Sequence, residues 1–174
     1  MHPTRTFGRP GLIAALLLCL AAGVAFAAEN SDRILLFEAV GDVQILTPPG
    51  TRWINTKAPQ PLSAGDRLRT GPNGRIALVW SDTSDARSGA LTELEIRPPD
   101  APGAERGIYL FKGLLSFFHR GTPGRIRVVT RGAAAGIKGT EFVLAVEEAT
   151  GRTTISMIDG IVDFTNDLGS LEVT

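Results

Sequence analysis

The glycine-rich stretch Gly136 to Phe142 (GIKGTEF) is followed by the apolar run Val143 to Val146 (VLAV). A glycine-rich stretch that carries a lysine suggests two structures, a loop that binds phosphate or a turn that leads into a buried strand. A P-loop requires a second glycine immediately before the lysine and Ser or Thr immediately after it. Here Ile137 precedes Lys138 and Gly139 follows it, so the phosphate-binding pattern fails.

The same residues fit the entry into a buried strand. Gly136 and Gly139 permit a tight turn or a bulge, and the hydroxyl of Thr140 can hydrogen-bond to the turn backbone. Alternate residues after the turn are apolar and share one face of a strand, as their spacing of two requires: Phe142, Leu144 and Val146. This stretch therefore predicts a β-strand with one buried face.

Outward from this stretch, the chain alternates short β-rich runs with turn residues and nowhere sustains a helical repeat. The predicted strands are 34–40, 42–47, 75–80, 90–96, 107–118, 125–130, 141–147, 153–158 and 161–165. Many short strands separated by turn signals predict a single all-β domain, of solenoid, roll or sandwich type, with a barrel also open.

Turn chemistry predicts how some of these runs are connected. Asn73-Gly74 precedes a strand whose alternate residues share one face, and Asp159-Gly160 predicts a hairpin between its two flanking strands. The polar segment 81–89 and the proline-rich segment 97–106 predict loops. Residues 171–174 have the character of a further strand that the end of the chain interrupts, so we expect a fragment of a longer protein.

The first residues have the pattern of an export signal. Arg5 and Arg9 precede the apolar segment 11–24, and Ala25-Phe26-Ala27 forms a small-residue cleavage site, so residues 1–27 are predicted to be a helical signal peptide. The apolar segment is shorter than the roughly 20 residues of a membrane span, although an uncleaved anchor is the alternative. We therefore expect a periplasmic or secreted protein, with the all-β domain at residues 34–174.

Composition narrows the classes of ligand. The lone cysteine, Cys19, lies in the predicted signal peptide, so a mature chain would have neither disulfides nor cysteine-ligated zinc. The chain has 18 Lys and Arg against 18 Asp and Glu, without a basic run, which makes nucleic acid a poor candidate partner. We expect no metal and no cofactor.

Catalysis is the less favoured hypothesis. Hydrolysis by a serine nucleophile needs a histidine base held by an acid, and the predicted mature chain offers only His119, which we expect to be a partly exposed structural residue. A glycan hydrolase would need paired carboxylates, but such pairs are common on solvated surfaces. The candidate pairs are Asp82 with Asp85, Glu93 with Glu95, and Glu147 with Glu148. We therefore predict a protein that is not an enzyme.

The order of the motifs resembles that of the FecR domain family. Gly41-Asp42-Val43 is similar to the family's opening strand, and residues 62–75 (LSAGDRLRTGPNGR) closely resemble its hallmark. Residues 128–130 (VVT), 137–142 (IKGTEF) and 160–162 (GIV) resemble later family motifs, although Arg131 stands where the family has proline. The resemblance extends over roughly residues 34–174. It implies a structural role in turns for Gly65, Asp66, Thr70, Gly71, Gly139, Thr140 and Phe142.

The resemblance implies an all-β periplasmic domain. In the signalling branch of the family, such a domain receives a signal from an outer-membrane transporter, and a cytoplasmic arm controls a sigma factor. At most ten residues precede the apolar segment of this chain, so direct contact with a sigma factor is not expected.

These observations favour a non-catalytic envelope module that binds a protein or a cell-wall polysaccharide. The candidate partner contacts are Trp53, Asp82 and Ser84, with the aromatic residues Tyr109, Phe111, Phe117 and Phe118 as further candidates. A sensor component that signals through a partner membrane protein is the alternative, and a hydrolase is the third hypothesis. Any contact with a membrane would come from an uncleaved signal anchor.

Overall fold

The computed structural model describes residues 34–80, 84–99, 107–119, 126–137 and 141–174. The predicted signal peptide, Cys19, Asp82, Gly139 and Thr140 lie outside these ranges. In the described residues the secondary structure is β-strand with turns, as the sequence predicted. The strands are β1 (Ile34–Val40), β2 (Val43–Leu46), β3 (Ile54–Asn55), β4 (Gln60–Leu62), β5 (Arg67–Thr70), β6 (Arg75–Trp80), β7 (Asp85–Ser88), β8 (Glu93–Arg97), β9 (Gly107–Phe118), β10 (Arg127–Val129), β11 (Ala134–Ile137), β12 (Glu141–Val146), β13 (Thr153–Asp159), β14 (Val162–Asn166) and β15 (Gly169–Val173).

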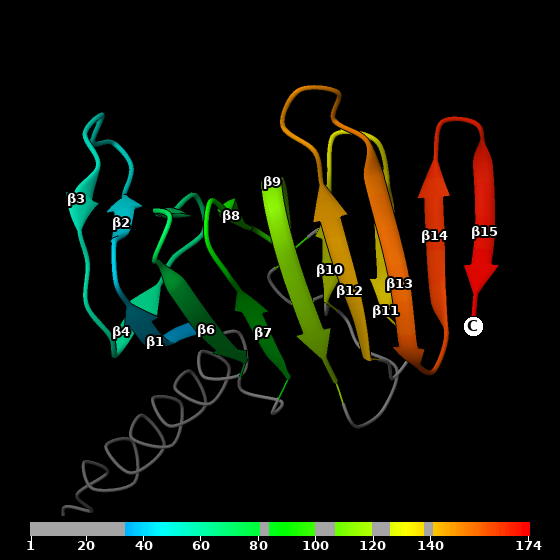
Figure 1. The fold of residues 1–174 in the computed structure, drawn as a ribbon, viewed down its shortest axis with the longest axis horizontal. Coiled ribbons are helices and arrows are strands. Elements are labelled where there is room, and N and C mark those ends of the chain that lie inside the picture. Colours follow the sequence, from blue (N-terminus) through cyan, green and yellow to red (C-terminus); the bar gives the residue numbers. More distant parts are fainter. Residues whose placement is uncertain (1–33, 81–83, 100–106, 120–125, 138–140) are drawn as a thin grey trace, which may run out of the picture. The chain divides into compact units, whose positions relative to one another are not determined.

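All of these strands belong to one open hydrogen-bonded sheet, and β9 divides it into two layers (Figure 1). Layer A has the order β4-β1-β6-β7-β9-β12-β13. Layer B has the order β3-β2-β5-β8-β9-β10-β11-β14-β15. Every pairing is antiparallel except that of β9 with β10.

Strand β9 belongs to both layers because it bends at its middle. Its first half, up to Lys112, pairs with β8 in layer B, and its second half, from Gly113, pairs with β12 in layer A. Gly113 has a φ of +94°, and a Cβ at this position would overlap the backbone of Thr92. Glycine is therefore required where the strand passes from one layer to the other.

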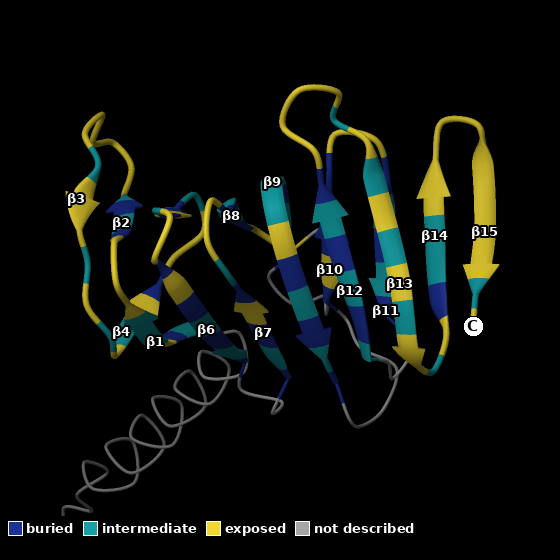
Figure 2. Cartoon of the chain, viewed as in Figure 1, coloured by how far each residue is buried: buried dark blue, intermediate teal, exposed yellow. Residues whose placement is uncertain are grey.

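The core lies between the two layers. Alternate residues of β6, β8 and β12 point inward and are buried, and the inward residues of both layers form one continuous apolar cluster (Figure 2). Phe142, Leu144 and Val146, which the sequence placed on one buried face, are 0%, 0% and 4% exposed. Phe117 stacks on Phe142 and meets Trp80 edge to face, with ring centroids 5.6 and 5.7 Å apart.

Three local predictions were wrong. Segment 81–89, predicted as a loop, contains β7, whose inward side chains Ala86 and Ser88 are too small to give a strand-like apolar signal. Gly136 lies inside β11 and not in a turn. Asp159-Gly160 does not form a hairpin: β13 pairs with β12 in layer A, while β14 pairs with β11 in layer B. The chain crosses between layers there, and Val162 is buried beside its partner Ile137.

Candidate functional site

The hallmark residues hold together the turns at one corner of the sheet. The amide of Gly71 donates to the carbonyl of Asp42 over 2.8 Å, and a Cβ on Gly71 would overlap the side chain of Asp42. The hydroxyl of Thr70 donates to the carbonyl of Gly89 over 2.6 Å and accepts from the amide of Thr92 over 2.9 Å. These contacts join the connection between β1 and β2 to those around β5, β6 and β8.

The Gly65-Asp66 pair stabilises another turn, the one before β5. Gly65 has a φ of +90°, which favours glycine, and the carboxylate of Asp66 accepts from the amide of Ser63 over 2.7 Å. Two backbone hydrogen bonds to Ile96, each 2.8 Å long, attach this turn to β8. Asp66 is 4% exposed, so it stabilises the turn and offers no surface for a ligand.

A group of arginine and aromatic side chains lies on the outer face of layer B. We call it the Arg–aromatic band, and it consists of Trp53, Arg67, Arg69, Arg97, Tyr109 and Phe111. The guanidinium carbon of Arg69 lies 4.4 Å from the ring centroid of Trp53, and that of Arg67 lies 4.3 Å from the centroid of Phe111. The rings of Phe111 and Tyr109 are 4.6 Å apart, and Arg97 lies 6.0 Å from the Tyr109 ring.

Strand alternation places these side chains on one face. In β5, Leu68 is buried inward, so Arg67 and Arg69 on either side of it point outward. In β9, Leu110 is buried, so Tyr109 and Phe111 likewise point outward. Antiparallel pairing of β5 with β8, and of β8 with β9, then brings the two outward sets together.

Carboxylates beside the band fix its arginines. Glu93 forms an ion pair with Arg67, and Glu95 accepts from Arg97 over 3.2 Å. Arg69 donates to the side-chain oxygen of Gln44 over 2.8 Å. The charges of the band are therefore largely matched within the protein, while its aromatic rings remain partly exposed. Such a surface can contact a partner through stacking and apolar area.

The structure places the partner contacts predicted from the sequence in different parts of the domain. Trp53 belongs to the band, but Ser84 is fully buried and its side chain is not available to a partner. Asp82 lies outside the described residues. Phe117 is a core residue, whereas Phe118 lies on the outer face of layer A. The sequence pattern did not single out Arg67 and Arg69, although their alternation with Leu68 was a visible signal.

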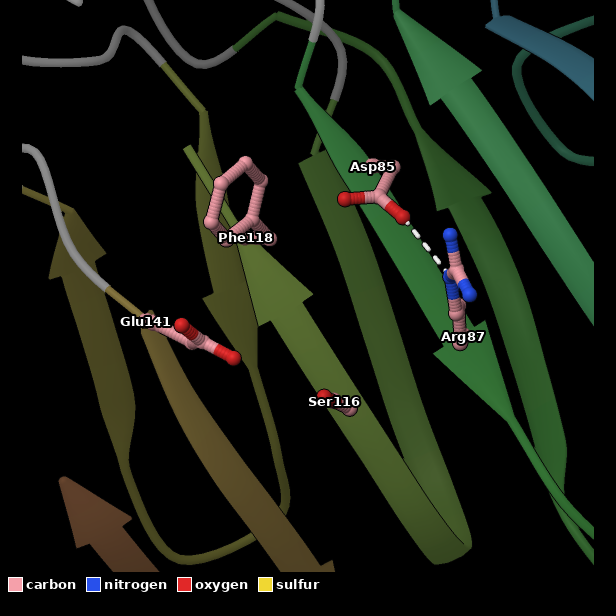
Figure 3. Close-up of a pocket in the computed structure, with 5 residues that line it drawn as sticks. All are labelled: Asp85, Arg87, Ser116, Phe118 and Glu141. Carbon is pink, nitrogen blue, oxygen red and sulfur yellow. Dashed lines mark hydrogen bonds and ion pairs between the residues drawn. The ribbon is translucent and has the colours of Figure 1, made fainter. Parts of the chain in front are cut away.

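A shallow hollow of about 280 Å³ lies on the outer face of layer A, around Phe118 (Figure 3). Asp85 and Glu141 flank this ring on neighbouring strands, and Ser116 lies two residues before it. Asp85 accepts from Arg87 over 2.8 Å. One of the two carboxylates is thus engaged in an ion pair.

His119 is buried, contrary to the expectation of partial exposure. It is 5% exposed, and its Nδ1 lies 2.5 Å from Oγ of Ser84, which is 0% exposed. A serine and a histidine in contact are two parts of a nucleophilic triad, but a substrate must reach the serine oxygen. Because burial blocks that access, the pair is a structural hydrogen bond under the end of β9.

Glu93, a further hydrolase candidate, lies on the opposite layer from the hollow and is paired with Arg67. Among the residues that the structure describes, no cluster of three or more His, Cys, Asp or Glu could hold a metal ion. The described part of the chain also contains no helix able to cross a membrane.

Comparison with known proteins agrees with the motif order. A family model described as FecR protein matches residues 66–163, from Asp66 in the hallmark to Asp163 in β14. Neither the curated proteins nor the solved structures include a significant match. The FecR family comprises signalling regulators and not enzymes. The match spans more than half of the chain, so this protein belongs to the FecR family.

Proposed function

We propose that the β domain is a non-catalytic binding module of the cell envelope, and that the Arg–aromatic band is its contact surface. The observation that carries this proposal is the joint placement of partly exposed Trp53, Tyr109 and Phe111 among arginines on one face of layer B. Trp, Tyr and Arg are the residues that most often supply the binding energy of protein interfaces.

The band has the properties that a contact surface needs before its partner arrives. Stacking and ion pairing hold the long side chains of Arg67 and Arg69 in place, so little side-chain entropy remains to be lost on binding. These properties favour an envelope protein as the partner, and a cell-wall polysaccharide is the second candidate.

Membership of the FecR family supports a role in signalling at the envelope. In this second form of the proposal, the module is a periplasmic sensor component that acts through a partner membrane protein. An export signal at residues 1–27 would deliver the chain to that compartment. The two forms of the proposal share the same contact surface. They differ in whether binding passes a signal to a partner membrane protein.

The test is capture of partners from envelope extract on the immobilised protein, with protein and glycan fractions measured separately. Trp53→Ala and Tyr109→Ala should each lower capture of the main partner by at least about tenfold, as loss of an interface hot spot does. A partner that is a membrane protein would favour the sensor form. Retention of polysaccharide alone would favour the glycan form.

Phe118→Ala provides the matched control, because Phe118 is also aromatic and partly buried but lies on the outer face of layer A. This variant should retain normal capture. If Phe118→Ala lowered capture as much as Trp53→Ala did, or if neither band variant had an effect, the Arg–aromatic band would not be the contact surface.

A further inference from the structure

The two layers have equal numbers of strands on one side of β9 and unequal numbers on the other. Toward β1, layer A adds β7, β6, β1 and β4, and layer B adds β8, β5, β2 and β3. Toward the last strands, layer A adds only β12 and β13, whereas layer B adds β10, β11, β14 and β15. Layer B therefore overhangs layer A by β14 and β15, which lie at one end of the sheet (Figure 1).

The overhang leaves apolar side chains uncovered on the inner face of layer B. Phe164 lies opposite both Ala135 and Leu171, and Ala135 is fully buried, so all three point toward the core side. Leu171 is nevertheless 65% exposed, and Phe164 is only partly buried. Figure 2 shows that exposure rises from β12, which is largely buried or half-buried, to β15, which is largely exposed.

Strand β13 borders this uncovered face and has one free edge. In the described residues it pairs with β12 alone. The amide of Glu147 donates to the carbonyl of Arg152, and hydrogen-bonded pairs alternate along an antiparallel ladder, so Ile155 and Met157 direct their backbone groups to the free edge. A strand added here would extend layer A directly over Phe164 and Leu171.

A second copy of the domain does not fit this edge through its own β13. Such a copy would continue layer A, and its own β11 and β14 would have to lie beneath the added strand. The overhanging β14 and β15 of the first copy already fill that space. The edge therefore accepts a thin element of one or two strands.

Charge indicates the chemistry of that element. From Thr153 to Thr174 the chain contains four acidic residues and no Lys or Arg, and two of them, Asp163 and Glu172, alternate with the inward Phe164 and Leu171 and so face the outer side of layer B. Asp159 ends β13, and Asp167 lies in the turn between β14 and β15, so acidic groups stand at both ends of the overhang. Asp159 and Asp167 therefore favour a basic partner at this edge.

We propose that the free edge of β13 and the overhang of β14 and β15 form a docking site for an extended basic segment of a partner polypeptide. The segment pairs with β13 through its backbone and places alternate apolar side chains on Phe164 and Leu171. Its basic side chains point to the outer face. This mode of recognition is strand addition to a sheet edge, and it uses a surface distinct from the Arg–aromatic band.

The probe is a fluorescent peptide in which valine alternates with lysine, titrated with the purified protein and followed by anisotropy. Saturable binding is expected, together with slower hydrogen exchange at the amides of Ile155 and Met157. A peptide with alternate backbone nitrogens methylated cannot pair with the edge and should bind at least about tenfold more weakly. A valine–glutamate peptide should also bind more weakly.

Leu171→Lys should weaken peptide binding by a similar factor, because it removes apolar area and adds a repelling charge. Phe37→Lys is the matched control, since Phe37 is 61% exposed on β1 and far along the sheet order from β15. Trp53→Ala should also leave peptide binding unchanged, so this proposal and the role of the band can fail separately. Circular dichroism checks that each variant is folded.

Three results would overturn the proposal: no saturable binding of the valine–lysine peptide, equal binding of the methylated peptide, or equal binding by Leu171→Lys. A concentration-dependent dimer that Leu171→Lys abolishes, with no effect of the peptide, would assign the surface to a second copy and would equally overturn it.

Discussion

The two sides of β9 are built from the same kind of strand, yet they differ in how completely they exclude water. On the side of β1 and β6, four strands of each layer face one another, and the inward residues Ile34, Leu36 and Leu78 are fully buried. On the side of β14 and β15, two strands face four, and Leu171 points inward but remains exposed. Alternation alone therefore does not bury a residue, because burial also needs an opposing layer.

The largest expected effect contrasts one leucine from each side. Leu78→Ala should lower the free energy of unfolding by about 2–5 kcal/mol, because it deletes fully buried methyl groups and leaves a cavity. Leu171→Ala should change it by less than about 0.5 kcal/mol, as exposed substitutions usually do. Urea unfolding measures both values, and similar losses would show that Leu171 is covered in solution.

A smaller effect is expected at the bend that both sides share. Gly113→Ala forces a side chain into a positive φ and against the backbone of Thr92, and the backbone conformation alone should cost about 1–3 kcal/mol. Gly89→Ala is the control, since a Cβ there meets no atom within 4 Å. Thermal unfolding should separate the two variants. If they had equal midpoints, the requirement for glycine at position 113 would be rejected.

The smallest effect is expected from surface charge, on both sides alike. Arg75 pairs with Glu38 over 3.0 Å on the first side, and Arg152 pairs with Glu147 over 3.6 Å on the second. All four side chains are well exposed, so Glu38→Gln and Glu147→Gln should each cost no more than about 1 kcal/mol. A large loss on one side only would mean that charge, and not apolar burial, distinguishes the two sides.

The elements with strong alternation were predictable from the sequence. The bounds of β1, β6 and β9 coincide with the predicted runs, because each carries large apolar residues at a spacing of two. Strands β7 and β11 were missed because Ala86, Ser88 and Ala135 are buried but small. Gly160 has a φ of +88°, a conformation that suits a turn, but the pairing partner of β14 was set by a distant strand, β11.

The candidate site was predictable only in part, for a related reason. Trp53 was identifiable as an aromatic residue among polar neighbours, but its stacking partner Arg69 comes from another strand. Phe111 meets Arg67 only after β9 has paired with β8 and β8 with β5. Contacts of this kind depend on the register of three strands, which a local pattern does not encode.

The sharing of β9 between the layers also has a consequence for folding. Half of this strand pairs with β8 and half with β12, so neither side can unravel without exposing hydrogen-bonding groups of the strand that holds the other. The two sides should therefore fold in a single cooperative transition, despite their unequal burial. Most of the ladders join strands distant in sequence, a topology that folds slowly compared with helical bundles. We expect the assembly of β9 with its neighbours on both sides to limit the folding rate.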